Sequence, residues 1–588
     1  MLALLLAATV VAQSSFDLAM RAYVDVDLPT AKRLFADAAI HDSDPHRRAR
    51  AALRLAYIAW HIDRDAAAAR KWLDSIDDEE TLPSAWTERA RLDMGLANDF
   101  DAGRADAAHA LHAPKPTDSM RAATLHAAAS IEPAMRGIAV DRAQLDAAKE
   151  ELRDAIGASG PFVEAARLQL DAAIVTNDGP TALAAWREYF GATAQSAILT
   201  SAEKALANWS DRRGVGLALA RSGFFREAAT ILQTVPKDEA VSDVIAYAKF
   251  VDRAKNIADD YYRDVALKRA DVNAFRASFD EARQALWNAL SWNGKRPQFS
   301  STAFDEEIGR RYNAVVRFGN TANIFVLHYA HKVSDERRTI SQFGREAPLQ
   351  FVVLDGVVSN GFQMWYGPSG GDGGWADTAI YQVRPMYANG PLADWLRAMN
   401  PSLRDERERN IVDETARDND RAAVEPIRFF PGVQLRLERL YDDSVLDALK
   451  TKGLAGDQLR DAYIARVERD VMESSIWSHE GRHAIDKKYG HWITSPELEF
   501  RAKLSQLQFA PSPLHAIVDI AGSGNPEFGD TPHGKANRRI AQALFDWMKT
   551  HAAQINGLDA SRPLMLQLDK LTDDQVRAAA RAVDPLAK

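Results

Sequence analysis

Apolar residues recur three and four positions apart through the first half of the chain, from about residue 16 to residue 290. This spacing places apolar side chains on one face of an α-helix, and the segment has few β-branched runs that would favour strands. Some apolar positions also recur at a nearly constant offset, so that Leu55, Ile62, Ala69 and Leu73 match Leu92, Phe100, Ala107 and Leu111. The sequence therefore predicts pairs of helices that repeat along the chain.

One turn in this half resembles a known repeat. Residues 220–228, ARSGFFREA, are similar to the turn of a tetratricopeptide repeat, in which a glycine lets two helices cross closely, an aromatic side chain fills the groove and an alanine opens the second helix. The resemblance implies that residues 15–295 form a tetratricopeptide-like α-helical repeat array with a surface available to a protein partner. An irregular helical domain without repeats is the alternative.

Residues 296–588 have a different pattern. Three segments are rich in β-branched or aromatic residues and are bounded by turn formers, so they are predicted to be strands: 323–330, 349–358 and 379–387. A glycine-rich loop, residues 367–374, separates the last two. Helical spacing then returns, and the longest helix is expected from about Asp457 to Tyr489. The predicted fold class is mainly α, with an N-terminal helical array followed by an α+β domain.

Charge and cysteine content exclude several functions. The formal net charge of -9, with no basic stripe, argues against nucleic acid as a partner. The chain has no cysteine, which excludes disulfides, thiol catalysis and thiolate metal sites. Any bound metal must therefore be held by histidine, aspartate or glutamate.

Residues 1–14, MLALLLAATVVAQS, are an apolar run that ends in small residues. This is typical of the core of a secretory signal, so we expect export to the periplasm or secretion. No lysine or arginine precedes the run, which leaves a buried helix as the alternative. No later stretch has the roughly 20 consecutive apolar residues that cross a bilayer, so no membrane span is expected in the mature chain.

The segment 476–485, IWSHEGRHAI, contains the pattern H-E-x-x-H inside the longest predicted helix. Two histidines four residues apart lie about 40° apart around a helix, so His479 and His483 can both reach one metal ion. Glu480 is displaced by about 100°, where its carboxylate can reach a metal-bound water. The spacing thus indicates a catalytic metal site.

A catalytic zinc site takes three protein ligands and keeps one position open. The next helix is expected to begin at Ser495 and Pro496, a good cap and a good first residue. It offers Glu497 and Glu499, which lie about 200° apart, so only one can face the ion. Glu497 is in the first turn, where a carboxylate also suits the helix dipole.

The run Glu499-Phe-Arg-Ala502 resembles the gluzincin metallopeptidases, in which a glutamate on a helix after H-E-x-x-H completes the site beside a small residue. The resemblance covers residues 476–502. It implies Glu499 as the third ligand and Zn²⁺ as the cofactor. It also implies that Glu480 is the general base, which takes a proton from the metal-activated water that cleaves peptide bonds.

Two residues depart from the gluzincin pattern. Arg482 is charged where the family is usually uncharged, and Lys503 stands where an acidic partner for a histidine ligand is common. Asp486 projects near both histidines and either orients one of them or forms an ion pair with Arg482.

The resemblance also implies a histidine or tyrosine that stabilises the oxyanion. His533, in the turn GDTPHGKAN with Asp530 beside it, is the candidate, and Tyr381, Tyr387 and His515 are substitutes. A histidine in a surface loop without a catalytic role is the alternative. In peptidases of this type an edge strand pairs with the substrate, and the predicted strand 379–387 is expected to do so, with the glycine-rich loop closing over the cleft. An internal strand with an idle loop is the alternative. His328 and His331 are interpreted as structural histidines.

These features predict a zinc-dependent peptidase that acts on exported or cell-envelope proteins, with a peptide or protein as substrate. Two alternatives stay open. One is a non-catalytic helical-repeat scaffold, and the other is a metal-dependent amidohydrolase with a non-peptide substrate.

Overall fold

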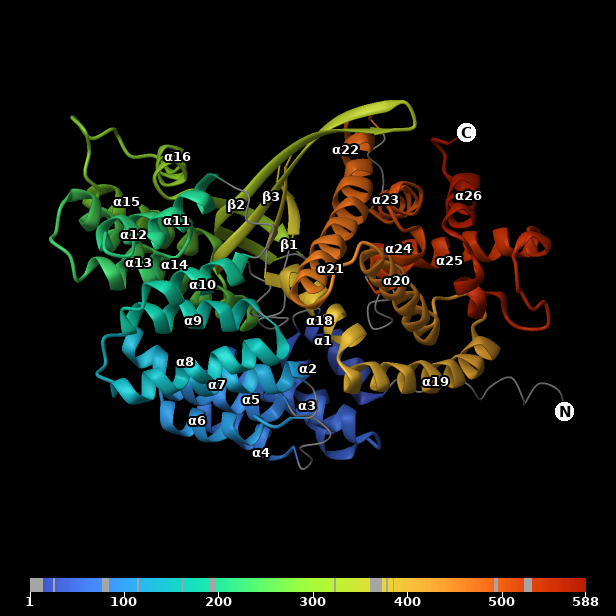
Figure 1. The fold of residues 1–588 in the computed structure, drawn as a ribbon, viewed down its shortest axis with the longest axis horizontal. Coiled ribbons are helices and arrows are strands. Elements are labelled where there is room, and N and C mark those ends of the chain that lie inside the picture. Colours follow the sequence, from blue (N-terminus) through green and yellow to red (C-terminus); the bar gives the residue numbers. More distant parts are fainter. Residues whose placement is uncertain are drawn as a thin grey trace. The chain divides into compact units, whose positions relative to one another are not determined.

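The computed structural model describes most of the chain (Figure 1). Residues outside the description are 1–13, 25–26, 77–83, 114–115, 161, 191–196, 322–323, 360–372, 377–378, 384, 491–494, 523–530 and 588. The predicted signal segment, except Ser14, and most of the glycine-rich loop are among them. The described elements are mostly helices, which confirms the expected mainly α class.

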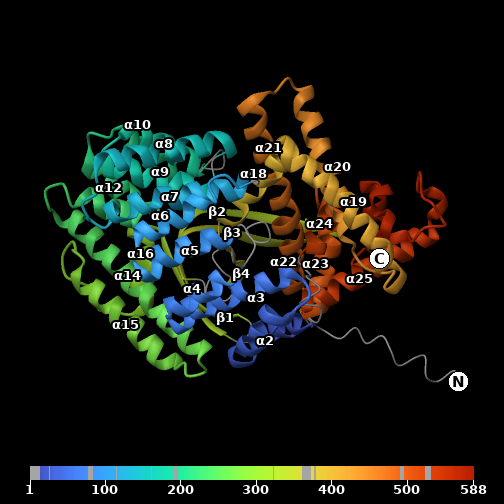
Figure 2. The same ribbon diagram turned by 90° about the horizontal axis from the view of Figure 1, so that it is seen from below.

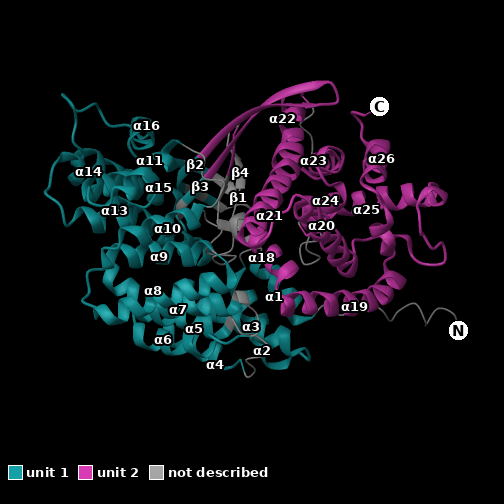
Figure 3. Ribbon diagram, viewed as in Figure 1, with its two compact units in different colours: residues 1–333, 354–372 teal, residues 334–353, 373–588 magenta. Residues whose placement is uncertain are grey.

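The chain divides into two compact units, shown in Figure 3. Unit 1 comprises Met1–Val333 and Leu354–Asp372, and unit 2 comprises Ser334–Val353 and Gly373–Lys588. The predicted boundary at residue 295 differs from this division. Phe318, which lies beyond that boundary, packs edge-on against Phe275 and Phe279 of the helical half, and these aromatic contacts extend the first unit.

Unit 1 begins with a succession of helices. They are α1 (Ser15–Val24), α2 (Leu28–His41), α3 (Pro45–Ile58), α4 (Ala66–Asp74), α5 (Ser84–Leu92), α6 (Phe100–His109), α7 (Pro116–Met135), α8 (Arg142–Ser159), α9 (Val163–Thr176), α10 (Gly179–Phe190), α11 (Ala197–Ala207), α12 (Arg212–Arg221), α13 (Phe225–Leu232), α14 (Glu239–Ala266), α15 (Val272–Ala289) and α16 (Ser301–Tyr312). Consecutive helices pack against each other, and α6 to α10 lie side by side in Figures 1 and 2.

A local conformation recurs in this unit. Two short π-helical segments, η1 (Ala59–Asp63) and η2 (Asp93–Ala97), each end at a residue with left-handed backbone, which is followed by an aspartate that caps the next helix. These residue pairs are Arg64 with Asp65 and Asn98 with Asp99. The sequence separation between these two pairs is shorter than the separation between the matching apolar positions. The repeated turn conformation therefore does not follow the repeat of apolar residues in the sequence.

The turn that resembles a tetratricopeptide repeat joins α12 to α13. Gly223 has a φ of +93°, a backbone conformation that favours glycine. A Cβ at this residue would lie 3.0 Å from Cβ of His331, so the glycine also allows a close approach to the neighbouring strand. Ala228 of the second helix is fully buried.

Five strands form one sheet: β1 (Ala314–Thr321), β2 (Ile324–Gln342), β3 (Arg345–Ser359), β4 (Gly373–Ala376) and β5 (Ala379–Val383). Their order is β1-β2-β3-β5-β4. The boundary between the units falls within β2 and β3, so the end of this hairpin, with its turn at Phe343 and Gly344, belongs to unit 2.

The prediction that residues 379–387 form an edge strand is wrong. β5 lies between β3 and β4, so it cannot pair with a substrate along a free edge. The described glycine-rich residues Gly373 and Gly374 belong to β4, which pairs antiparallel with β5 in the register Gly374↔Tyr381 and takes the outer position. Residue 387 belongs to the following helix, and its side chain is outside the description.

The remainder of unit 2 is helical. Its helices are α18 (Pro385–Met399), α19 (Pro401–Val424), α20 (Pro431–Thr451), α21 (Gly456–Val471), the π-helical η4 (Met472–Glu480), α22 (Gly481–Lys488), α23 (Ser495–Phe509), α24 (Pro513–Gly522), α25 (Pro532–Thr550), the 3₁₀ turns η6 (Ala552–Gln554) and η7 (Leu564–Lys570), and α26 (Asp573–Val583). A core cluster draws buried residues from α20, α23, α24, α25 and α26.

The last helix, α26, begins at Asp573 as expected, and Thr572 and Gln575 cap it reciprocally. No helix in the described part of the chain combines the length and apolar character needed to cross a lipid bilayer.

Candidate metal centre

The H-E-x-x-H pattern lies on a continuous run of helix, α21, η4 and α22, from Gly456 to Lys488. This agrees within one residue with the predicted helix. The nine residues of η4, which end at Glu480, are π-helical, and Ser478 Oγ donates to the carbonyl of Glu473 five residues earlier at 2.6 Å. Stretches of π-helix are rare and occur frequently at functional sites.

The end of β2 packs tightly against this helix. Gln342 Nε2 donates to the backbone carbonyl of Ser478 at 2.9 Å. A Cβ built on Gly481 would lie 2.8 Å from Cγ2 of Ile340, so only glycine fits at this position without displacing the strand. Arg338 adds an ion pair with Glu473 at 2.6 Å. These contacts fix the backbone on both sides of Glu480.

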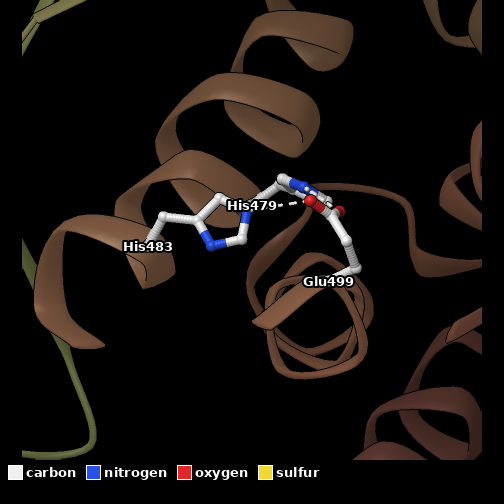
Figure 4. Close-up of side chains that lie close together, drawn as sticks. All are labelled: His479, His483 and Glu499. Atoms are coloured by element: carbon white, nitrogen blue, oxygen red, sulfur yellow. Dashed lines mark ion pairs between the residues drawn. The ribbon is translucent and has the colours of Figure 1, made fainter. Parts of the chain in front are cut away.

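The side chains of His479, His483 and Glu499 point toward one another (Figure 4). Nε2 of His479 lies 3.4 Å from Oε2 of Glu499, and Nε2 of His483 lies 3.6 Å from Oε1. One ligand atom from each residue lies within 4.8 Å of the others. The structure therefore brings together the two predicted histidines and the glutamate of α23 that the gluzincin resemblance implies.

Glu497 does not take part in this cluster. Its carboxylate forms ion pairs with Arg501, at 3.2 Å, and with Arg539. Because the two glutamates face different sides of α23, only Glu499 faces the histidines, as the helical geometry requires.

Burial and neighbouring charges act in opposite directions on the pKa values of two residues in the cluster. Burial alone would raise the pKa of the Glu499 carboxyl, but the imidazoles of His479, His483 and His533 outweigh it and hold this pKa well below its ordinary value. Burial would lower the pKa of His483, but Glu499 and the nearby Glu480 raise it overall. The carboxylate of Glu499 is thus ready to act as a ligand.

A buried amide orients one histidine. Nδ1 of His479 lies 3.2 Å from Oε1 of Gln506, while Nε2 of Gln506 donates to Ser474 Oγ at 3.1 Å and to Asp519 Oδ2 at 2.5 Å. Sequence reasoning missed Gln506. The available signal was its position seven residues after Glu499, which places both side chains on one face of α23.

The ion-pair interpretation of Asp486 agrees with the structure. Asp486 accepts from Nε of Arg482 at 3.2 Å, and Arg482 also donates to Asp584 near the end of the chain, at 3.1 Å to Oδ2. All three side chains are fully buried. Two carboxylates therefore neutralise the Arg482 guanidinium inside the protein.

Lys503 is also buried, one turn after Glu499 on α23. Burial lowers the pKa of Lys503 from 10.5 to about 8, against the opposing attraction of Glu499 and Asp519. Lys503 lies beside the cluster, and its burial disfavours the charged form of its amine.

His533, in the first turn of α25, reaches the same carboxylate, with Nδ1 3.1 Å from Oε2 of Glu499. Its side chain remains 46% exposed. Thr531 caps this helix by accepting from Gly534 N. Asp530, predicted to orient His533, lies outside the described residues.

His515 and His331 make contacts that are typical of structural residues. His515 stacks on Tyr441 with ring centroids 3.9 Å apart. His331, in unit 1, is fully buried, and its Nε2 lies 2.9 Å from the hydroxyl of Tyr247. The side chain of His328 is outside the description, and Tyr381 lies on the internal strand β5.

The donor set fits a divalent metal. Two imidazoles and one carboxylate are the ligands of many catalytic zinc sites. Tetrahedral ligands at about 2.0–2.2 Å from an ion lie roughly 3.3–3.6 Å from one another. Each histidine Nε2 lies at such a distance from one of the two Glu499 oxygens, 3.4 Å for His479 and 3.6 Å for His483. The same donors also accept other divalent ions. Comparisons of the chain with protein-family models, with curated proteins and with solved structures found no match in any of the three.

Proposed function

We propose that this protein is an exported zinc-dependent peptidase whose metal is held by His479, His483 and Glu499. One observation carries the proposal: the three donors converge from two helices, and Glu480 follows the first of them directly in the chain. A purely structural metal site would use four protein ligands. Among the described residues, the convergent group contains three, as a catalytic site needs.

A bound zinc ion would supply the polarisation of a scissile carbonyl and a lowered pKa of water. Glu480 is partly exposed, whereas His479 and His483 are buried. We assign to its carboxylate the transfer of a proton from the attacking water to the leaving nitrogen. Such acid–base transfer contributes roughly 10²–10⁴-fold to rate.

We assign to His533 the stabilisation of the oxyanion. Its Nδ1 faces Glu499 at 3.1 Å, which leaves Nε2 as the ring nitrogen available to a substrate carbonyl oxygen. The partial exposure of the ring supports this role, because a group that contacts substrate must be accessible. The tetratricopeptide-like array of unit 1 would then recognise a protein substrate or partner.

The proposal is tested by measuring metal content and peptide cleavage. We would purify the chain from Ser15 onward, together with Glu480→Gln, Glu499→Gln and the matched control Glu497→Gln from the same helix. Elemental analysis is expected to give about one zinc per chain in the parent, Glu480→Gln and Glu497→Gln, and marked loss in Glu499→Gln.

Cleavage of fluorogenic casein is the second readout. Glu480→Gln is expected to lose at least about 100-fold in activity while keeping its zinc, and Glu497→Gln to retain activity. Absence of zinc from the parent after reconstitution would refute the metal site. Zinc binding without cleavage of casein or of mixed peptides would refute the peptidase and leave the amidohydrolase alternative.

A further inference from the structure

A groove lies between α14 and α15 of unit 1, far in sequence from the metal ligands. Its cavity volume is about 420 Å³. The residues that α14 contributes recur every three or four positions, so one face of the helix forms one wall. They are Ser242, Ile245, Ala246, Lys249, Phe250 and Arg253.

The groove has a buried apolar floor, and small exposed side chains border it on the α15 side. Phe250, Ala282 and Leu286 are buried and form an apolar floor. Ala285 and Ala289 lie exposed on the α15 side. Their small side chains leave room for the backbone of a bound segment to approach the floor, and an apolar floor favours apolar side chains by removing them from water.

The α14 side of the groove is basic. Lys237, Lys249 and Arg253 line the groove, and none of its described lining residues is acidic. Arg253 pairs with Glu281 of α15 at 2.9 Å. Lys237 and Lys249 are exposed, and neither forms an ion pair with another residue that the structure describes. These two lysines therefore offer positive charge to a ligand in the groove, on a chain whose net charge is -9.

We propose that this groove binds an acidic peptide segment of another protein. The apolar side chains of the segment lie on the floor, and its carboxylates pair with Lys237 and Lys249. The spread of the cations favours a peptide over a single-headed anion such as a fatty acid. Lys237 lies just before α14 and Lys249 lies within it, roughly 18 Å along the helix direction, so more than one carboxylate is needed to contact both lysines.

Binding is tested with a fluorescein-labelled peptide composed of glutamate and leucine in helical spacing. A length of about 12 residues gives a helix of roughly 18 Å, which is enough to reach the cations. Fluorescence anisotropy is measured with the full chain, without added zinc, so the result does not depend on the metal centre. We expect saturable binding that weakens as salt concentration rises. Matched peptides in which lysine replaces glutamate, or serine replaces leucine, are expected to bind at least tenfold more weakly.

Two pairs of variants locate the site. Lys249→Glu, in the wall, is expected to weaken binding of the acidic peptide at least tenfold, while Lys255→Glu, on the same helix but outside the groove, changes it less than twofold. Ala285→Trp fills the groove and is expected to weaken binding at least tenfold, while Ala277→Trp, exposed elsewhere on α15, does not.

Three results would overturn the proposal. The first is no saturable binding of the acidic peptide. The second is equal weakening by Lys249→Glu and Lys255→Glu, which would show attraction to the general surface charge. The third is binding of a fluorescent fatty acid that Ala285→Trp blocks, with no binding of the acidic peptide, which would identify a lipid site.

Discussion

Nδ1 of His479 lies 3.2 Å from the side-chain carbonyl oxygen of Gln506, whose amide nitrogen donates to Asp519 and Ser474. Because an amide oxygen only accepts, Nδ1 of His479 carries the proton and Nε2 keeps its lone pair for a metal. Partners of this kind typically contribute about 10- to 100-fold to metal affinity.

We therefore expect Gln506→Leu to lower zinc affinity by about 10- to 100-fold in a competition titration with a chromogenic chelator. Gln506→Glu keeps an acceptor for His479 but sets its second carboxylate oxygen against Asp519, so its zinc affinity should lie between those of Gln506→Leu and the parent. Gln542→Leu, on the exposed face of α25, serves as the control. Unchanged zinc affinity in Gln506→Leu would show that the amide has no orienting role.

The fully buried pair of Arg482 and Asp584 ties the end of the chain to the metal helix. Removing one partner of a buried ion pair leaves an uncompensated charge, which typically costs about 3–5 kcal/mol. Because Asp486 still faces Arg482, we expect Asp584→Asn to lower the free energy of unfolding by about 3 kcal/mol, the low end of that range.

Urea unfolding, followed by tryptophan fluorescence, measures this effect. The control is Asp574→Asn, since the Asp574 side chain is 93% exposed in its pair with Arg577. An exposed pair of this kind is worth about 0–1 kcal/mol. Equal effects of the two substitutions would contradict the structural role of Asp584.

Gly481 provides a test of packing within the H-E-x-x-H motif. An added methyl group would lie 2.8 Å from Cγ2 of Ile340. We expect Gly481→Ala to destabilise the protein by about 1–2 kcal/mol, because overpacking costs about 1–3 kcal/mol while the gain in helix propensity returns up to about 1 kcal/mol. Zinc affinity should fall as well, since Glu480 and His483 flank this backbone.

The comparison is with Gly522→Ala in α24, where no atom of the residues that the structure describes lies within 4 Å of an added Cβ. This control should be neutral or stabilising by up to about 1 kcal/mol. Thermal unfolding by circular dichroism distinguishes the two. A Gly481→Ala protein as stable as the parent would mean that β2 can move away from the motif at little cost.

Local patterns predicted the elements that depend on local spacing. The span of the motif helix was correct within one residue, since helical periodicity is carried by neighbouring residues. The convergence of His479 and His483 follows from the geometry of one helix. Glu499 came from a family resemblance, because spacing alone left Glu497 open and the choice depends on how α23 packs.

Long-range contacts were not visible in the sequence. Asp584 lies 102 residues from Arg482, and nothing near either residue indicates the other. Pairing between strands is similarly non-local. β4 contains Gly373 and Gly374, which read as loop residues, yet its pairing places β5 inside the sheet. Gln506 was predictable in principle from its spacing to Glu499, but an amide is a less familiar partner for a histidine than a carboxylate.

Lys503 gives the stability of the protein a specific dependence on pH. Burial lowers its pKa from 10.5 to about 8 in the folded chain. Between about pH 8 and 10.5 the unfolded chain therefore binds a proton that the folded chain has lost, and the free energy of unfolding rises with pH in this window. A shift of this size corresponds to at most about 3 kcal/mol.

Replacement of Lys503 by methionine removes the titrating group and keeps most of the side-chain volume. We expect the metal-free Lys503→Met protein to be more stable than the metal-free parent by about 1–3 kcal/mol at pH 7, because the parent there bears the cost of a buried charge. The difference should shrink as the pH approaches 10, where Lys503 is neutral in the folded parent. Urea unfolding at pH 7, 8, 9 and 10 measures it, with the exposed Lys535→Met as the control. A stability difference that stays constant over this range would show that Lys503 does not titrate there, and that the polar groups around it hold its charge.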